Sequence, residues 1–529
     1  MSDARTARPG PTTQPDAPPE ATGQGGPTLT RRASLNALAA LVDYAARIII
    51  QLVLAPLMLR FLGVTGFGIW QVLQRLIGHA TPANGRPSEA LKWVVAQQQG
   101  SGDVRTKRAQ VGTALAVWLL FLPALGVVGG ALAWVSPALV HASSGHATEV
   151  RVAAAVLVLN LMVLGVGSVP QSVLQGENLG YRRLGLSTAI LGVGALLTVL
   201  ALRSGWGLVG VAAATCVATA LSGLTYLQIV RSQVPWWGIS RPAPRAVRGF
   251  LGISSWFLLW NLVMQAIKSS DVIVLGAFGG VALVTTYALT SYVPQAVSDT
   301  VFMMISATMP GLAGLIGSGE RERAARIRAE TIALCWLLAV AAGAVVIAWL
   351  PWFVSLWVGK QYDAGTLPTV LIILMVLQLA LIRVDSNVID LTLRIRGKVL
   401  LGLLSVALSA GLGALLVGPA GLGLPGLVAG FMAGRLPLSI AYPVLVGRLL
   451  GLGVRSQALA AVRPLLATVV LVAAAIVLRG MVEAGSWLTL VPLGLVSTAA
   501  SLLAAYLGGL NRHQRRRIRS RMRKVVGRT

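Results

Sequence analysis

Residues 35–59 read LNALAALVDYAARIIIQLVLAPLML, an apolar run that starts shortly after the basic pair Arg31 and Arg32. A helix that crosses a membrane needs about 20 predominantly apolar residues, and this run is long enough. The whole chain of 529 residues is 55% apolar and only 12% charged, whereas soluble proteins are about 25% charged. This composition excludes an ordinary soluble enzyme, a disordered protein and a disulfide-knit secreted domain. It predicts an all-α polytopic membrane protein.

Further apolar runs of this kind follow, and counting them predicts about 14 membrane helices. A proline or glycine often marks an end or a kink of a run, as at Pro56 and Pro170. The expected spans are 35–59, 64–83, 110–135, 150–174, 184–202, 206–230, 248–268, 280–314, 328–350, 366–390, 399–417, 422–446, 462–480 and 487–509.

The basic residues alternate across these spans. If the N-terminus is cytoplasmic, 34 of the 44 Lys and Arg residues lie in inside segments, five lie in outside segments, and five lie within helices. Membrane proteins concentrate Lys and Arg on the cytoplasmic side. The net charge of +27 is therefore interpreted as a topology signal and not as a nucleic-acid surface. We expect a multi-pass protein of the cytoplasmic (cell) membrane with both termini cytoplasmic.

Short matches recur at a nearly constant separation. Trp118 and Trp336 are 218 residues apart, as are Trp134 and Trp352, and Phe61 lies 217 residues before Phe278. Each repeat contains six helices, an even number, so both copies enter the membrane from the same side. The substrate is expected at the interface between the two copies. The expected parts are a disordered cytoplasmic tail (1–33), two parallel six-helix lobes around a central cavity (34–232 and 233–450), helices 13 and 14 (451–510), and a basic cytoplasmic tail (511–529).

Motifs for soluble catalysis are absent from the sequence. The chain has no GxxxxGK[ST], HExxH, CxxC or GxSxG pattern. His141 and His146 could form a metal pair, but a solvated loop is the favoured interpretation. Cys216 and Cys335 lie in apolar runs and predict no disulfide. We therefore expect no enzyme activity, no catalytic residue, no cofactor and no metal.

Polar residues form one stripe along the first helix. Asn36, Asp43, Arg47 and Gln51 fall on one face at 100° per residue. Ionisable residues inside a membrane are expensive and usually face a bundle interior or a wet cavity. Asp43 and Arg47 are also spaced i,i+4, so they form either a structural pair or part of a cavity wall. Both alternatives stay open.

Similar stripes lie on the second, seventh and eighth helices, which are the helices that would line the cavity of a parallel two-lobe transporter. The buried cations are the favoured lining residues, whereas amides and hydroxyls also serve as contacts between helices. The candidate substrate-binding residues are Arg47, Arg75, Lys268, Asn36, Gln51, Asn261, Gln265 and Tyr287.

The tenth and twelfth helices carry further charges. Arg383, Asp385 and Asp390 are best interpreted as partners in ion pairs between helices. Arg435 could reach the cavity or pair with an Asp of the tenth helix, and the sequence favours neither.

The residues resemble a known family. The segment from Asn36 and Arg47 through Pro56 to Trp70, which includes RFLGVTGFGIW at 60–70, resembles the start of oligosaccharide flippases, the polysaccharide transporters of the multidrug/oligosaccharidyl-lipid/polysaccharide exporter superfamily. Asp271 to Gly280 followed by Tyr287 is similar to that family's second-repeat opening, and Gly205–Gly210 to its connection between helices 5 and 6. The stretch from Ala83 to Lys92 departs from the family pattern.

This resemblance implies a cargo. Such proteins flip polyprenyl-pyrophosphate-linked oligosaccharides across the cytoplasmic membrane by alternating access during polysaccharide biosynthesis, with a polysaccharide polymerase and glycosyltransferases as possible partners. Arg and Lys suit the pyrophosphate. The alternatives are a cation-coupled multidrug exporter, in which Asp43 would be the coupling residue, and a lipid II flippase of the same superfamily. A membrane-embedded glycosyltransferase is disfavoured because no long outside loop bears carboxylates.

Overall fold

The computed structural model describes residues 26–81, 87–97, 103–177, 179, 185–242, 244–391, 396–512, 514–516 and 519. All regular structure in these residues is helical, so the predicted all-α class is confirmed. The predicted disordered tail falls mostly outside the described residues, as does most of the basic tail. The elements are α1 (Gly26–Gly78), α2 (Pro87–Gln97), α3 (Val104–Leu139), α4 (Ser144–Gly176), α5 (Leu186–Arg203), α6 (Gly207–Gln233), α7 (Pro244–Phe278), α8 (Val281–Thr290), α9 (Tyr292–Gly317), α10 (Arg321–Trp357), the short 3-10 helix η3 (Lys360–Tyr362), α11 (Thr366–Asp390), α12 (Arg396–Val417), α13 (Gly423–Gly434), α14 (Leu436–Leu450), α15 (Val454–Met481) and α16 (Trp487–Gly509).

The predicted apolar segments correspond to these helices, except that the span predicted at 64–83 runs past the end of α1 at Gly78. In the described part, 11 helical segments are individually long and apolar enough to cross a membrane. The bounds differ most in four places. The twelfth predicted helix is divided at Arg435 into α13 and α14. The seventh predicted helix ended at 268, whereas α7 continues to Phe278. The eighth is divided at Ser291 into α8 and α9. Residues 87–97, expected in a cytoplasmic segment between spans, form α2.

The chain leaves helical geometry at Gly63, between the first two predicted spans. Its φ of 70° and ψ of 178° lie in a region that only glycine populates readily. Gly280 has nearly the same geometry, with φ 86° and ψ 157°, at the entrance to α8. These two glycines stand 217 residues apart, which is the separation of the sequence matches. The same glycine turn therefore occurs twice, at the separation of the sequence matches.

Replacing Gly63 or Gly280 by alanine is expected to destabilise the protein by about 1–3 kcal/mol, because a Cβ is strained in this backbone region whatever space surrounds it. No atom lies within 4 Å of the added Cβ at either site, so the effect isolates the backbone. Gly130→Ala in α3 is the control, since Gly130 is helical and equally open. Thermal unfolding in detergent measures the difference. Equal stability of all three variants would contradict this explanation of the turns.

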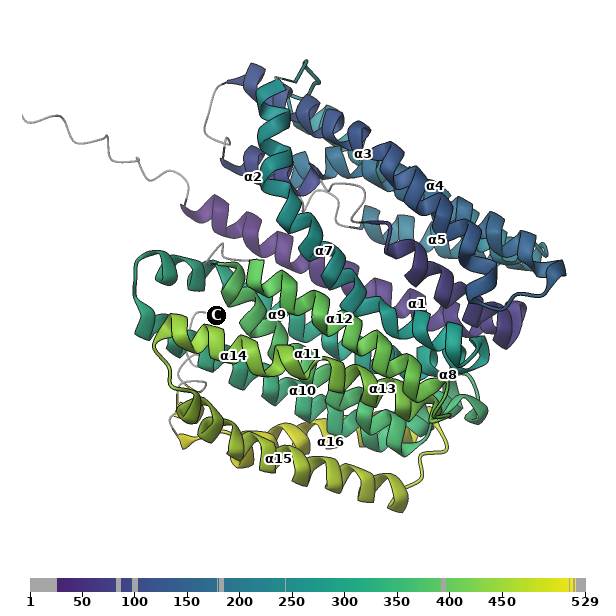
Figure 1. Cartoon of the computed structure of the whole chain (residues 1–529), viewed down its shortest axis with the longest axis vertical. Coiled ribbons are helices and arrows are strands. Elements are labelled where there is room, and N and C mark those ends of the chain that lie inside the picture. Colours follow the sequence, from purple (N-terminus) through teal and green to yellow (C-terminus); the bar gives the residue numbers. More distant parts are fainter. Residues whose placement is uncertain are drawn as a thin grey trace, which may run out of the picture.

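The helices form two groups with a third attached (Figure 1). Helices α3 to α6 pack on one another in the N-terminal lobe, and α7 to α14 form the C-terminal lobe. Helix α1 lies between the lobes, since it packs on α5 as well as on α7 and α8. Its second half approaches α8 very closely: a Cβ on Gly68 would lie 2.1 Å from the backbone oxygen of Val281. We call the end of the molecule that holds Gly63 and Gly280 the Gly63 end.

The connection between the lobes is fixed to the N-terminal lobe. After α6, the backbone N–H of Ser240 donates to the carbonyl of Arg108 in α3, over 3.3 Å. The indole N–H of Trp236 donates to Glu177 at 2.8 Å, and Lys107 lies 3.7 Å from the same carboxylate. Burial of this ion pair requires such extra hydrogen bonds. The contacts hold the start of α7 against α3.

Helices α15 and α16 dock on α10. The indole N–H of Trp336 donates to Thr468 at 2.9 Å, and that of Trp349 donates to Ser497 at 2.9 Å. Arg479 pairs with Asp363 at 3.0 Å. The outer faces of α15 and α16 carry exposed large apolar side chains, such as Leu488 at 87%, as a lipid-facing surface requires.

Candidate functional site

The first half of α1 presents two of the predicted residues on the surface. Arg47 and Gln51 are exposed, and Ile49 between them is 61% exposed. The side chains of Asn36 and Asp43 lie outside the described residues, so the Asp43–Arg47 pair stays a prediction. Arg47 and Gln51 share one face of the helix, and Ile49 lies on the opposite face, so this half of α1 is exposed on two sides.

The predicted residues of the second and seventh helices come together where α1 crosses α7. Arg75 donates to the backbone oxygen of Lys268 over 3.4 Å. Gln265 donates to Ser269 at 3.0 Å, and its amide lies beside Gly78 of α1. Asn261, one to two turns earlier on α7, is half-buried. Arg75, Gln265 and Lys268 therefore form one polar contact between α1 and α7.

Tyr287 lies in the interior and not on an open surface. It is 3% exposed, and its hydroxyl donates to Asp271 at 2.6 Å. The other carboxylate oxygen of Asp271 accepts the backbone N–H of Val272 at 2.8 Å. Asp271 therefore has hydrogen bonds to both oxygens, which is how a buried carboxylate is retained in an apolar setting.

Arg435 approaches the same stretch of α7 from the break between α13 and α14. It is 2% exposed and donates to the backbone oxygen of Ile267 at 2.6 Å. Its Nε and Nη1 atoms have no hydrogen-bond partner within the described residues. The alternative left open by the sequence is thereby resolved: Arg435 contacts α7 and makes no ion pair with an Asp of α11.

Two more cations meet over one aromatic ring. The ammonium of Lys268 lies 5.3 Å from the centre of the Phe302 ring, and the guanidinium carbon of Arg383 lies 6.0 Å from it. Arg383 also contacts the sulfur of Met264 at 3.5 Å. Cation–π contacts of this kind are worth about 0.5–2 kcal/mol, and they hold two positive charges near each other.

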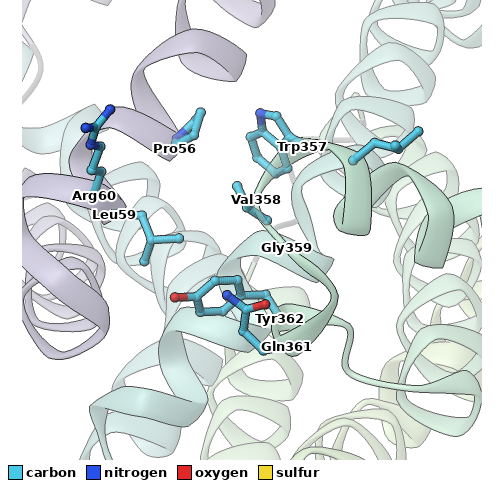
Figure 2. A pocket seen from close by; sticks show the side chains of 9 residues that line it. Pro56, Leu59, Arg60, Trp357, Val358, Gly359, Gln361 and Tyr362 are labelled. Carbon is cyan, nitrogen blue, oxygen red and sulfur yellow. The ribbon is translucent and has the colours of Figure 1, made fainter. Parts of the chain in front are cut away.

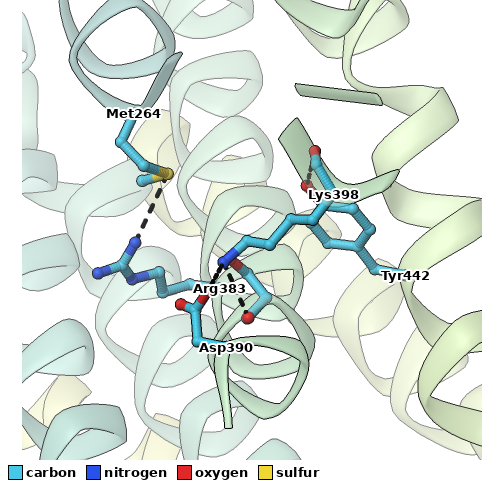
Figure 3. A network of polar contacts seen from close by, with 6 residues as sticks. Met264, Arg383, Asp390, Lys398 and Tyr442 are labelled. Carbon is cyan, nitrogen blue, oxygen red and sulfur yellow. Dashed lines mark hydrogen bonds and ion pairs between the residues drawn. The ribbon is translucent and has the colours of Figure 1, made fainter. Parts of the chain in front are cut away.

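The acidic residues of α11 are used by cations of other helices. Arg328 of α10 makes a two-pronged pair with Asp385, at 2.6 and 2.8 Å. Lys398 of α12 pairs with Asp390 at 2.5 Å and lies 3.7 Å from the Trp260 ring. Arg383 therefore makes no ion pair in the described part of the chain (Figure 3). Ion pairing between helices occurs here, but Arg383 does not take part.

Breaking the Arg328–Asp385 pair is expected to destabilise the fold strongly. Asp385→Asn leaves a buried guanidinium without its counter-charge, and loss of one partner of a buried pair costs about 3–5 kcal/mol. The double variant Arg328→Met with Asp385→Leu removes both charges and is expected to recover most of that stability. Chemical unfolding of the purified protein compares them. A neutral single variant would show that the pair is not structural.

We call Arg75, Lys268, Arg383 and Arg435 the α7 cation cluster, since all four contact α7 or a ring beside it. Asp271 acts electrostatically on Arg435, and Asp390, which is already paired with Lys398, acts on Arg383. With Lys398 counted, five cations stand beside two carboxylates, which leaves an excess of positive charge. Such a site attracts an anion, and guanidinium groups suit phosphate oxygens in particular.

The first half of α1 is tied to the C-terminal lobe at a proline. Pro56 has no backbone N–H, so the carbonyl of Leu52 lacks its helical partner. The indole N–H of Trp357, at the end of α10, donates to that carbonyl at 2.7 Å. Tyr44 donates to the carbonyl of Ala296 at 3.0 Å, and Thr285 to that of Val64 at 2.6 Å. The bonds of Trp357 and Thr285 tie α1 to the C-terminal lobe near the Gly63 end, and that of Tyr44 ties it farther from this end.

A pocket of about 300 Å³ lies beside this contact. Figure 2 shows Pro56, Leu59 and Arg60 of α1 on one side of it, with Trp357 and Tyr362 on the other. The remaining lining residues are Leu356, Val358, Gly359 and Gln361.

Sequence reasoning found part of this site. It selected Arg75 and Lys268 because buried cations stand out in apolar runs. It did not assign Arg383 to the site, because Arg383, Asp385 and Asp390 were interpreted as partners in ion pairs between helices. Only the packing of α10 and α12 shows that Asp385 and Asp390 are already paired. The described residues contain no group of three metal-ligating side chains.

Comparison with sequence-family models finds no match, and no curated protein matches the chain. Solved structures do resemble it. A multidrug resistance MATE family transporter of the MOP superfamily, in an inward-facing conformation, aligns with a TM-score of 0.59 and 15% identity over 76% of this chain and 95% of that chain.

Two further structures cover more of the chain. The lipid II flippase MurJ in an inward closed conformation aligns with a TM-score of 0.64 and 10% identity, over 88% of this chain and 97% of that one. The eukaryotic MATE transporter AtDTX14 aligns with a TM-score of 0.57 and 15% identity, over 84% and 98%. At these identities the likeness concerns the fold. The chain has the fold shared by MATE transporters and the MurJ lipid II flippase.

Proposed function

We propose that this protein flips a polyprenyl-pyrophosphate-linked oligosaccharide across the cytoplasmic membrane by alternating access, for assembly of cell-surface polysaccharide. The single observation that supports it most is the α7 cation cluster. Arg75 and Arg383 are half-buried and Lys268 is exposed, so a cargo anion could reach them between the lobes. A pyrophosphate supplies negative charge that balances the excess of these cations over Asp271 and Asp390.

The rest of the cargo fits the same region. Gln265 and Asn261 lie within about two turns of Lys268 on the same helix, so their amides stand near the cations for sugar hydroxyls. Gln51 is a further exposed amide on α1. A polyprenyl tail would remain in the bilayer, where burial of apolar surface favours it. The likeness to a lipid II flippase supports a lipid-linked cargo. A polysaccharide polymerase and glycosyltransferases are the expected partners in such assembly.

For transport, the lobes at 34–232 and 233–450 would rock about the cargo, and both termini would be cytoplasmic. The Gly63 end then faces outward. The few basic residues expected outside gather there: Arg60 lines the pocket at that end, and Arg479 pairs with Asp363 next to η3.

Cysteine labelling tests this orientation. In a variant without Cys216 and Cys335, Gly145→Cys is expected to react with a membrane-impermeant thiol reagent from outside intact cells. Arg105→Cys is expected to react only after the cells are opened. Both positions are exposed, so access to the thiol depends on the side of the membrane. The reverse pattern would overturn the orientation.

The runner-up is a cation-coupled multidrug exporter, which the MATE likeness favours. That function needs a carboxylate that binds and releases the coupling ion, and Asp43 is the candidate in α1. The buried Asp271 is a poorer candidate, because Tyr287 and Val272 already occupy its oxygens. A lipid II flippase is the second alternative and differs from the proposal only in the glycan.

Ligand stabilisation tests the proposed head group. Polyprenyl pyrophosphate is expected to raise the unfolding temperature of the purified protein, whereas the corresponding polyprenyl alcohol is not, since only the former binds the cations. Lys268→Gln should remove the difference. Equal stabilisation by the two lipids would contradict a pyrophosphate site.

A further inference from the structure

We propose that the pocket at the Gly63 end is a second binding site, separate from the α7 cation cluster, which takes a single acidic sugar unit such as a uronate. Its volume of about 300 Å³ is at the lower end of ligand pockets, which span about 300–1,000 Å³. There is room for one ring-sized polar molecule and not for an oligosaccharide.

The lining combines the groups that recognise a sugar. Trp357 and Tyr362 provide aromatic surface, and Pro56 and Leu59 provide apolar surface for the C–H faces of a ring. Gln361 and the hydroxyl of Tyr362 have no hydrogen-bond partner in the described part of the chain. They can therefore donate to and accept from ring hydroxyls.

Arg60 determines the charge of the ligand. It is exposed at the mouth of the pocket, is the only charged residue in the lining, and makes no ion pair with a described residue. A guanidinium binds a carboxylate through two parallel hydrogen bonds. The preferred sugar is therefore acidic and not neutral.

The walls of the pocket come from different helices. Pro56, Leu59 and Arg60 belong to α1, which lies between the lobes, whereas Trp357 and Tyr362 belong to α10 and η3 (Figure 2). The bond from Trp357 to the Leu52 carbonyl holds these walls at their present separation. A ligand that touches both walls binds the conformation in which the Gly63 end is closed, and it stabilises that conformation in return.

Titration of the purified protein in nanodiscs with free glucuronate and glucose, followed by ligand-observed NMR, tests the proposal. We expect glucuronate to bind about tenfold more tightly than glucose, because a hydrogen bond between ions is lost with the neutral sugar. Arg60→Gln should lower the glucuronate affinity to that of glucose and leave glucose unchanged. Tyr362→Phe should weaken the binding of both sugars, because it removes the hydroxyl that bonds to the ring.

Two controls separate the alternatives. Arg203→Gln removes an exposed basic residue outside the pocket and should change nothing. Gly68 does not line the pocket. Because the pocket is formed when α1 and the C-terminal lobe close on each other, Gly68→Ala should weaken the binding of both sugars. Acetate that binds as well as glucuronate would overturn the sugar assignment. Loss of glucuronate binding in nanodiscs of anionic lipid, restored in neutral lipid, would assign the pocket to a lipid head group instead.

This inference rests on the proposed function only for the origin of the sugar, which would be the cargo glycan or its product. Binding is measured without transport, so the two can fail independently. Glucuronate binding by a protein that flips no lipid-linked glycan would leave the pocket assigned and the transport proposal wrong.

Discussion

Replacing Lys268 and Arg383 together by glutamine is expected to reduce flipping of a pyrophosphate-linked lipid to background. Both cations contact the Phe302 ring, and neither substitution changes the bulk of the site greatly. Each hydrogen bond between ions is worth about 1.5–3 kcal/mol, so each single variant should lose about tenfold to hundredfold in rate. Arg383→Lys should keep part of the activity, because it retains the charge but not the fork of donors.

The loss must come from cargo binding and not from misfolding. Because the two cation–π contacts are worth about 0.5–2 kcal/mol each, the variants should remain folded and in the membrane, as thermal unfolding can verify. Arg203→Gln, at an exposed site outside the cluster, is the matched control. Normal flipping by the Lys268→Gln, Arg383→Gln double variant would assign both residues a structural role.

The second large effect concerns the closure of the Gly63 end. Gly68→Ala would place a Cβ 2.1 Å from the backbone oxygen of Val281 and 2.9 Å from the hydroxyl of Thr285. Atoms cannot approach so closely, and a backbone oxygen cannot rotate away, so α8 must separate from α1. We expect the variant to favour a conformation that is open at the Gly63 end and to flip cargo poorly.

Accessibility of a buried cysteine measures this opening. Leu59 is 8% exposed, so Leu59→Cys in a variant without Cys216 and Cys335 should react slowly with a thiol reagent. Adding Gly68→Ala should accelerate the reaction about tenfold or more, as expected when a few kcal/mol of contact is lost. Gly192→Ala, where no atom lies within 4 Å of the added Cβ, should have no effect. An unchanged rate in the Gly68→Ala protein would show that α1 and α8 can adjust without opening.

The sequence predicts most of the fold because a membrane imposes long apolar helices, and these are visible in the residues alone. Prediction from the sequence fails where a polar group forms hydrogen bonds with residues that are distant in the chain. The helix predicted to end at 268 continues to Phe278. Asp271 lies within this continuation, where it accepts a hydrogen bond from Tyr287, and the nearby backbone of Ile267 accepts from Arg435.

The candidate site divides in the same way. Arg75 and Lys268 could be chosen from the sequence, because an isolated cation in an apolar run is a strong signal. Arg383 and Arg435 could not, because their assignment depends on which aspartates are already paired. Helix α2 was missed for a different reason: residues 87–97 are too few and too polar to resemble a membrane span.

Flipping in proteoliposomes tests the central claim most directly. The purified protein is reconstituted, and movement of a polyprenyl-pyrophosphate-linked oligosaccharide between leaflets is compared with uptake of a lipophilic cationic drug under an ion gradient. We predict protein-dependent flipping of the pyrophosphate-linked lipid that disappears in the Lys268→Gln, Arg383→Gln double variant, with no drug transport. Gradient-driven drug transport without movement of the lipid would contradict the proposal and identify the chain as a drug exporter.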